Sequence, residues 1–164
     1  SRSWIDEIRR DPQANAHVLL MRTLSKFGLA GIRLGYMLGA QALVHEIDKV
    51  RPPYNVSVLN AECALFALEH AAVFAQQAAQ IRDERIRLID ALKALPGVQP
   101  FPSEANMVLV RVPDARRAFD GMKARGVLVK NVSTMHALLA QCLRLTVGTP
   151  DENARMLAAF KESL

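Results

Sequence analysis

The stretch RTLSKFGLAGIRLGY, residues 22–36, decides the fold class that the sequence indicates. It joins two apolar runs through a loop that contains one lysine, Lys26, and several spaced glycines. The runs predict one strand over 17–24 and a second over 33–38, with turn-forming residues between them. The first run is apolar on both faces, which is typical of a strand that is covered on both sides. Because ligands bind beyond the carboxyl ends of strands in open α/β sheets, we expect Lys26 to lie at a ligand site.

The side chains of this loop form a donor set that suits a phosphate group. Arg33 offers a planar fork of donors, and the hydroxyls of Thr23 and Ser25 complete a phosphate shell. A lysine amine beside a phosphate site indicates a Schiff base with an aldehyde cofactor that carries a phosphate, and pyridoxal 5′-phosphate (PLP) is such a cofactor. The alternative is structural: the lysine and the arginine solvate the end of a loop, and the glycines only turn the chain.

The rest of the chain reads as a helical segment followed by a mixed segment. Apolar residues at steps of three and four predict a long helix over 71–95, which Pro96 and Gly97 end. Beyond that point, strand and helix patterns alternate, and they predict an open α/β sandwich of one sheet and one helical layer. The expected segments of the chain are therefore 1–45, 46–95 and 96–164.

A strand with two different faces is expected near the C-terminal end, in CLRLTV at residues 142–147. Leu143, Leu145 and Val147 share one face of this strand, while Arg144 belongs to the other. The leucine face is expected in the core, so that Arg144 projects from a rigid strand. An arginine that simply meets solvent is the alternative interpretation.

Capping residues mark the starts of two helices in the same segment. Asp114 is a favourable N-cap for a helix that Gly126 ends. The sequence TPDE, residues 149–152, has the form of a capping box with proline at the first helical position. The last helix is therefore expected to begin at Pro150.

The composition excludes several classes of protein. The chain has 164 residues, of which 51% are hydrophobic, with a net charge of +5. Its basic residues are spread along the chain, which argues against a nucleic-acid partner. No apolar run reaches the ~18 residues of a membrane span, and the four histidines lack metal-ligand spacing. Cys63 and Cys142 each have apolar neighbours, so we expect buried, reduced thiols in a cytoplasmic protein without a membrane or metal partner.

Four motifs extend the interpretation of the lysine loop over most of the chain. They are TLSK at 23–26, LAGIRLGY at 29–36, SEANMVLVR at 103–111 and CLRLTVGTPDEN at 142–153. In this order they resemble the fold-type I, class-II PLP-dependent aminotransferases, and most closely the histidinol-phosphate aminotransferases. The resemblance implies an α/β fold: the C-terminal part of the PLP-dependent transferase fold type I, with the end of a large-domain sheet and a small α/β domain. Residues 1–45 are then the C-terminal remnant of the large PLP-binding domain, 46–95 the connecting helices and 96–164 the small C-terminal α/β domain.

The resemblance also implies a role for each matching residue. Lys26 holds PLP covalently, Arg33 grips the cofactor phosphate, and Ser25 with Thr23 supplies hydroxyl partners. Arg144 binds the carboxylate of the amino donor and, in the other half-reaction, the phosphate of histidinol phosphate. Where the family often has a second arginine, this chain has Lys130, a point charge that we expect to assist in binding the substrate phosphate. The family offers no clear role for Asn106.

The reaction implied by the resemblance is transamination between histidinol phosphate and 2-oxoglutarate, a step of histidine biosynthesis, in a cytoplasmic homodimer. In the family, the groups that hold the cofactor ring come before the lysine, and the residues before Lys26 do not supply them. We therefore expect these 164 residues to be the C-terminal half of a longer enzyme and nearly inactive alone. Two alternatives stay open: a sister PLP enzyme, such as a threonine-phosphate decarboxylase or an aromatic aminotransferase, or a non-catalytic helical interaction domain.

Overall fold

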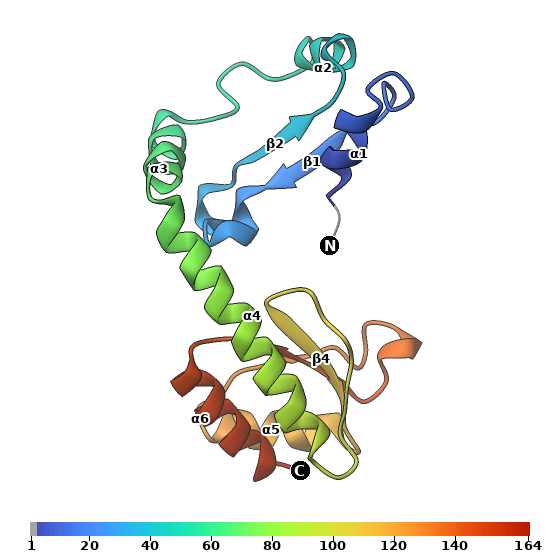
Figure 1. Cartoon of the computed structure of the whole chain (residues 1–164). Coiled ribbons are helices and arrows are strands. Elements are labelled where there is room, and N and C mark those ends of the chain that lie inside the picture. Colours follow the sequence, from blue (N-terminus) through green and yellow to red (C-terminus); the bar gives the residue numbers. More distant parts are fainter. Residues whose placement is uncertain (1–2) are drawn as a thin grey trace. The chain divides into compact units, whose positions relative to one another are not determined.

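The chain forms two compact units, unit 1 (Ser1–Ala75) and unit 2 (Gln76–Leu164). Figure 1 shows the order of their helices and strands. The computed structural model describes residues 3–164, so Ser1 and Arg2, which start the first of the three expected segments, lie outside the described residues.

Unit 1 is built around an antiparallel ribbon of two strands (Figure 1). Leu20 pairs with Leu38 at one end of the ribbon, and Thr23 pairs with Gly35 at the other end, where the lysine loop begins. The elements of the unit are α1 (Trp4–Arg10), β1 (Leu20–Thr23), the 3-10 turns η1 (Leu24–Phe27) and η2 (Ala30–Ile32), β2 (Gly35–Leu38), α2 (Gln41–Asp48) and α3 (Val58–Glu69).

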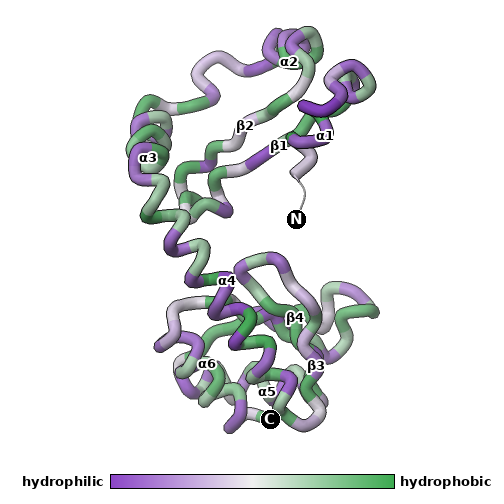
Figure 2. The backbone as a smooth tube through the Cα atoms, in the orientation of Figure 1, coloured by the Kyte–Doolittle hydropathy of each residue, from purple (hydrophilic) through white to green (hydrophobic). Residues whose placement is uncertain are grey.

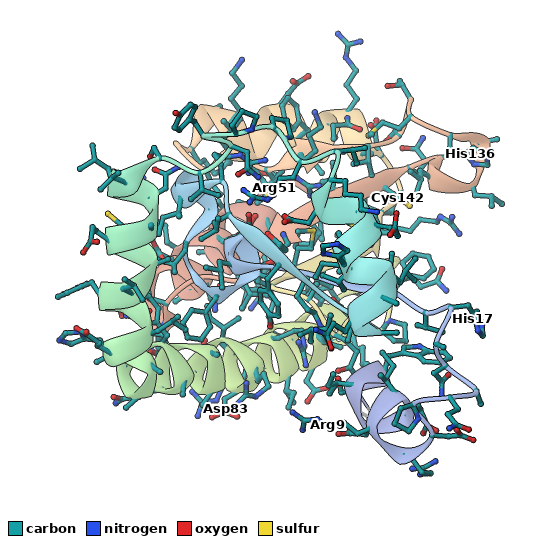
Figure 3. All side chains as sticks on the ribbon, turned by 90° about the horizontal axis from the view of Figure 1, so that it is seen from above. Arg9, His17, Arg51, Asp83, His136 and Cys142 are labelled. Atoms are coloured by element: carbon teal, nitrogen blue, oxygen red, sulfur yellow. The ribbon has the colours of Figure 1, made fainter. Side chains whose placement is uncertain are left out.

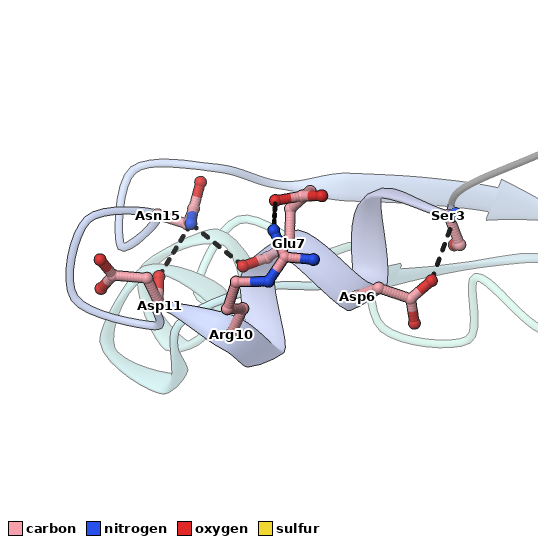
Figure 4. A network of polar contacts seen from close by, with 6 residues as sticks. All are labelled: Ser3, Asp6, Glu7, Arg10, Asp11 and Asn15. Atoms are coloured by element: carbon pink, nitrogen blue, oxygen red, sulfur yellow. Dashed lines mark hydrogen bonds and ion pairs between the residues drawn. The ribbon is translucent and has the colours of Figure 1, made fainter.

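Local polar bonds hold α1 and the turn that follows it (Figure 4), and a further bond connects the helix to the ribbon. Ser3 caps the helix, and the Asp6 carboxylate accepts a hydrogen bond from the Ser3 backbone N–H at 3.3 Å. The Asn15 amide donates to the Glu7 carbonyl at 3.3 Å, which closes the turn after the helix. On the ribbon, Arg22 Nη2 donates to Ser3 Oγ at 3.0 Å. The first helix is thus attached to β1 by its N-cap residue.

The two strands of the ribbon are shorter and more exposed than the sequence predicts. Of the expected strand over 17–24, only Leu20–Thr23 form β1, and the prediction that this strand is covered on both sides is wrong, because Met21 is 75% exposed. A ribbon of two strands without further strands paired to it within residues 3–164 leaves both outer edges open. The expected strand over 33–38 begins at Gly35, since Arg33 has a left-handed backbone conformation with φ 55°.

Unit 2 is an antiparallel sheet with the strand order β3-β4-β6-β5, covered by helices (Figure 1). Helix α4 begins in unit 1 and ends in unit 2. The elements are α4 (Ala71–Lys93), β3 (Gln99–Pro100), β4 (Met107–Arg111), α5 (Ala115–Ala124), β5 (Lys130–Asn131), the 3-10 turn η3 (Ala137–Leu139), β6 (Cys142–Thr146) and α6 (Pro150–Lys161).

One face of this sheet forms the core of unit 2. Val108 pairs with Leu145 and Val110 with Leu143, and all four side chains are fully buried. Figure 2 shows the hydrophobic residues along β4. Buried helix side chains pack against this face: Leu88, Leu92, Ala118, Met122, Met156 and Phe160. The alternation expected for CLRLTV is confirmed, because Arg144 is exposed on the other face.

Helix α6 begins at the expected capping box. The Thr149 hydroxyl accepts from the Glu152 backbone N–H at 3.3 Å, and the Glu152 carboxylate accepts from the Thr149 backbone N–H at 2.8 Å. That backbone bond, followed by a second bond from the Thr149 hydroxyl, lowers the pKa of Glu152 below its ordinary value of 4.5. The cap therefore contributes its full stabilisation above that ordinary pKa, and the contribution disappears as the pH falls through the lowered pKa.

We expect Thr149→Val to raise the pKa of Glu152, because valine removes the hydroxyl donor and leaves the backbone donor in place. The change also removes the N-cap acceptor, which costs about 1 kcal/mol of folding stability at neutral pH. An NMR titration of the Glu152 carboxyl carbon measures the first effect, and urea unfolding measures the second. An unchanged pKa of Glu152 in the variant would contradict the assignment of the hydroxyl as a cause.

The two cysteines differ in exposure. Cys142 is buried in β6, as expected (Figure 3), but the expectation is wrong for Cys63, which is exposed on α3. Helix α3 has hydrophobic residues on all sides, and within the described structure only Ala64 and Ala67 of this helix are buried. Large apolar residues such as Phe66, which is 62% exposed, remain on its surface.

No single helix within residues 3–164 is long and apolar enough to cross a membrane. Only together do α3 and α4 have the length and the apolar composition of a membrane span, and a bend of 75° separates the two helices.

Candidate active site

The lysine turn, which we define as residues 23–33, connects the two strands of the ribbon. Thr23 ends β1 and caps η1, because its Oγ1 accepts a hydrogen bond from the Ser25 backbone N–H at 3.1 Å. A second bond of 2.9 Å joins the Thr23 and Ser25 hydroxyls. Gly28 ends η1 with φ 88°, a conformation that favours glycine. The sequence thus folds into a short helical turn that carries Lys26 directly after a strand.

Lys26 lines a hollow of about 1020 Å³ in unit 1. Thr23 from the same turn also lines it, while the remaining walls are mainly apolar and come from the ribbon, α1 and α3. The next residue, Phe27, stacks on Phe74 with ring centroids 4.9 Å apart. This aromatic contact holds the turn against the first turns of α4, so the backbone that carries Lys26 has a defined position.

Arg33 lies on the other limb of the lysine turn and does not line the hollow. Its guanidinium is exposed and makes one hydrogen bond with the described residues, from Nη1 to the Ala30 carbonyl at 3.4 Å. The structure therefore brings Thr23, Ser25 and Lys26 together. Arg33 remains at the same end of the ribbon with donors that no described residue uses.

A second group of candidate residues, the cation pair, lies in unit 2. Lys130 of β5 and Arg144 of β6 are partners in the strand register, and both side chains are exposed. Residues directly opposite in antiparallel strands have Cβ atoms about 5 Å apart, and like charges there are unfavourable. Neither side chain forms a hydrogen bond or an ion pair with residues 3–164, so the pair suits a dianion such as a phosphate.

Two residues near the cation pair have contacts that were not expected: Arg111, which was not singled out from the sequence, and Asn106, which was named without a role. Arg111 of β4 donates to the carbonyls of Leu138 at 2.8 Å and Ala140 at 3.2 Å, and it thereby holds the segment that leads into β6. Asn106 uses its carbonyl to accept from the Val147 backbone N–H at 2.9 Å. The only sequence signal for these contacts is the alternation of the two strands, which does not identify their partners.

The described residues contain no group of three or more histidine, cysteine or acidic side chains that could hold a metal ion. The two groups offer amines, hydroxyls and a guanidinium group. The lysine turn combines a nucleophilic amine with hydroxyl donors, and the cation pair offers an anion site.

The end of the ribbon beside the lysine turn tolerates only glycine at position 35. A Cβ atom there would lie 2.7 Å from the Arg22 carbonyl oxygen on the partner strand. We expect Gly35→Ala to separate the strands locally and to destabilise the protein by about 1–3 kcal/mol. Urea unfolding measures the loss. Gly31→Ala is the matched control, because a Cβ at Gly31 meets nothing within 4 Å; equal losses in both variants would contradict the prediction.

Comparisons with known proteins identify the family of the chain. A family model described as Aminotransferase class I and II matches residues 5–160. The histidinol-phosphate aminotransferase of Paracidovorax citrulli is 71% identical over 165 residues, which cover 100% of this chain and 45% of that protein. The chain thus spans less than half the length of this relative.

Two solved structures are similar to the chain. Histidinol-phosphate aminotransferase from Sinorhizobium meliloti, in complex with pyridoxal-5′-phosphate, matches with a TM-score of 0.77 and 28% identity over 90% of this chain and 41% of that chain. L-Threonine-O-3-phosphate decarboxylase from Porphyromonas gingivalis matches with a TM-score of 0.79 over 93% of this chain and 48% of that chain. At 24% identity, the second match shows a common fold alone.

These matches confirm the fold class expected from the sequence, the C-terminal part of the PLP-dependent transferase fold type I. The family match extends from α1 to the last turn of α6 and includes both the lysine turn and the cation pair. The chain belongs to the aminotransferase class I and II family.

Proposed function

We propose that the chain is the C-terminal part of a PLP-dependent histidinol-phosphate transaminase, with 2-oxoglutarate as the amino acceptor. The observation that carries the proposal is Lys26, which lines a hollow beside a hydrogen-bonded pair of hydroxyls. The name and the 71% identity of the Paracidovorax citrulli relative support this substrate over those of sister enzymes. A cytoplasmic homodimer of the complete protein is part of the proposal.

The donor set of the lysine turn fits PLP. Lys26 supplies the amine for the cofactor aldehyde, and the exposed Arg33 supplies a guanidinium for the phosphate. The hydroxyls of Thr23 and Ser25 add donors on the same turn. When bound, the cofactor supplies an electron sink for the carbanion character that develops at the substrate Cα.

Lys26 then acts on the substrate as a base and an acid. With the cofactor bound, its amine would take the proton from the substrate Cα as a base and would give a proton to the cofactor C4′ as an acid. The short turn and the Phe27–Phe74 stack hold the backbone that carries this base in one position.

The cation pair binds the anionic part of the substrate. The Arg144 guanidinium presents a planar fork that suits the glutamate carboxylate in one half-reaction and a phosphate in the other. Lys130, opposite Arg144 in the strand register, adds a second positive charge for the phosphate. An anion between the two cations also relieves their mutual repulsion.

Labelling with borohydride tests the proposal. The complete polypeptide that carries these 164 residues is incubated with PLP, reduced and digested, and the modified peptide is mapped. We expect one pyridoxyl group on Lys26, together with transamination of histidinol phosphate by 2-oxoglutarate, and little activity from the 164 residues alone. A label on another lysine, or none, would refute the role of Lys26 and favour a non-catalytic domain. Activity only on threonine phosphate or aromatic substrates would favour a sister enzyme.

A further inference from the structure

A buried pair of polar side chains, Glu84 and Asn153, connects α4 to α6. Glu84 is 5% exposed and Asn153 is 4% exposed, and Asn153 Nδ2 donates to Glu84 Oε2 at 3.0 Å. The other carboxylate oxygen of Glu84 accepts from Arg87 Nη1 at 2.7 Å. A buried carboxylate and a buried amide are retained at a cost in desolvation, so a specific geometric role is worth testing.

Asn153 also holds the turn that follows β6. Its Oδ1 accepts from the Gly148 backbone N–H at 2.9 Å, and its Nδ2 donates to the Gly148 carbonyl at 3.1 Å. One amide thereby fixes both polar groups of a single residue and is itself held by Glu84. The turn also passes close to the start of α6, because a Cβ at Gly148 would lie 2.5 Å from Glu152 Oε2.

The neighbouring side chain on α4 holds the adjacent strand at the same end of the sheet. Arg85, which is 9% exposed, donates from Nη1 to the Ala105 carbonyl at 3.1 Å. The next residue, Asn106, accepts from the Val147 backbone N–H. Consecutive side chains of α4 therefore fix the start of β4 and the end of β6, while Asp83 beside them points away from the helix into solvent (Figure 3).

We propose that Glu84 and Asn153 are positioning residues for Arg144, an inference that rests on the proposed function. Arg144 lies in β6, four residues before Gly148, and its fork must match both oxygens of an anion to bind it bidentately. Without the bonds of Asn153, the groups of Gly148 and the Glu84 carboxylate must find water, which shifts the end of β6. Arg144 then meets the substrate anion with one hydrogen bond in place of two.

Exchange of the two functional groups tests this proposal in the complete enzyme. Asn153→Asp places two carboxylates in contact and removes the donor to the Gly148 carbonyl, whereas Glu84→Gln with Asn153→Asp restores the bond between the two side chains with donor and acceptor exchanged. We expect Asn153→Asp to raise KM for histidinol phosphate and for glutamate by roughly tenfold, with kcat changed less than twofold. The double variant should recover part of the loss in KM, because the bond between the side chains and the bond from the Gly148 backbone N–H can both form while the Gly148 carbonyl still lacks its donor. A phosphate titration that follows the Arg144 Nε–Hε NMR signal measures anion affinity without catalysis. It should rank the wild type, the double variant and Asn153→Asp in the same order as their KM values.

Two control variants separate positioning from stability. Ser163→Ala removes a buried hydrogen bond to the Ala159 carbonyl of α6, and Asp83→Asn removes an exposed charge from α4. Both should leave KM and phosphate affinity unchanged. The proposal is overturned if Asn153→Asp resembles Ser163→Ala in KM and phosphate affinity, or if the double variant folds without recovering either quantity. The two proposals can fail separately. If the wild type is inactive but Asn153→Asp still weakens the response of the Arg144 signal to phosphate, the proposed function is overturned and the positioning role is supported.

Discussion

Lys26→Ala is expected to reduce kcat/KM for transamination by at least about 10⁴-fold in the complete enzyme. The change removes the amine that binds the cofactor and the base that moves the Cα proton, so two functions are lost together. Steady-state kinetics with histidinol phosphate measure the loss, and the absorbance of the bound cofactor reports the loss of the covalent bond.

Folding should be unaffected by this change. Lys26 forms no hydrogen bond or ion pair with residues 3–164, so the melting temperature of the cofactor-free protein should stay within experimental error. Lys49→Ala is the matched control, since Lys49 is an exposed lysine of the same unit that pairs with Glu46 at 2.6 Å. Activity of the Lys26 variant above one tenth of the wild type would exclude Lys26 as the catalytic base.

Arg144→Ala is expected to raise KM for both anionic substrates by roughly 100-fold, because a charge-assisted fork is lost. Arg144→Lys should recover only a small fraction, since an ammonium group cannot form two parallel hydrogen bonds with a carboxylate. Lys130→Ala should weaken the binding of histidinol phosphate more than the binding of glutamate, because a phosphate carries a greater negative charge than a carboxylate. Initial rates at varied substrate concentrations measure all three values.

The same substitutions should not lower folding stability. Lys130 and Arg144 are like charges in register, so removal of either one is expected to leave the unfolding free energy unchanged or slightly higher. Arg116→Ala on α5 serves as a control for the loss of an exposed arginine, whose ion pair with Asp120 is 3.8 Å long. If that variant raised KM as much as Arg144→Ala, net charge rather than a defined site would explain substrate binding.

Features with a local physical cause were predictable from the sequence. The capping box at Thr149, the alternation of β6 and the end of the long helix near Pro96 depend on residues that are close in the chain. A hydrogen bond from a side chain to a nearby backbone group, or a period of two along a strand, requires no knowledge of distant contacts.

Features that depend on distant partners were not predictable. Glu84 and Asn153 are 69 residues apart, and the register that pairs Lys130 with Arg144 is set by sheet assembly. The prediction that β1 is buried was wrong for a related reason. Apolar residues indicate that a strand can be covered, but they do not identify the part of the protein that covers it. The left-handed conformation of Arg33 also makes the second strand shorter than predicted. This was not predictable, because no sequence pattern identifies a non-glycine residue with positive φ.

The unequal accessibility of the two sulfur atoms has a practical consequence. A maleimide dye should attach to Cys63 and spare Cys142 in the folded chain, because only the first thiol meets solvent. Cys63 lies on the helix whose Ala61, Ala64 and Leu65 line the hollow beside Lys26. Fluorescence from this single position would therefore report when a small molecule enters or leaves, without any engineered cysteine.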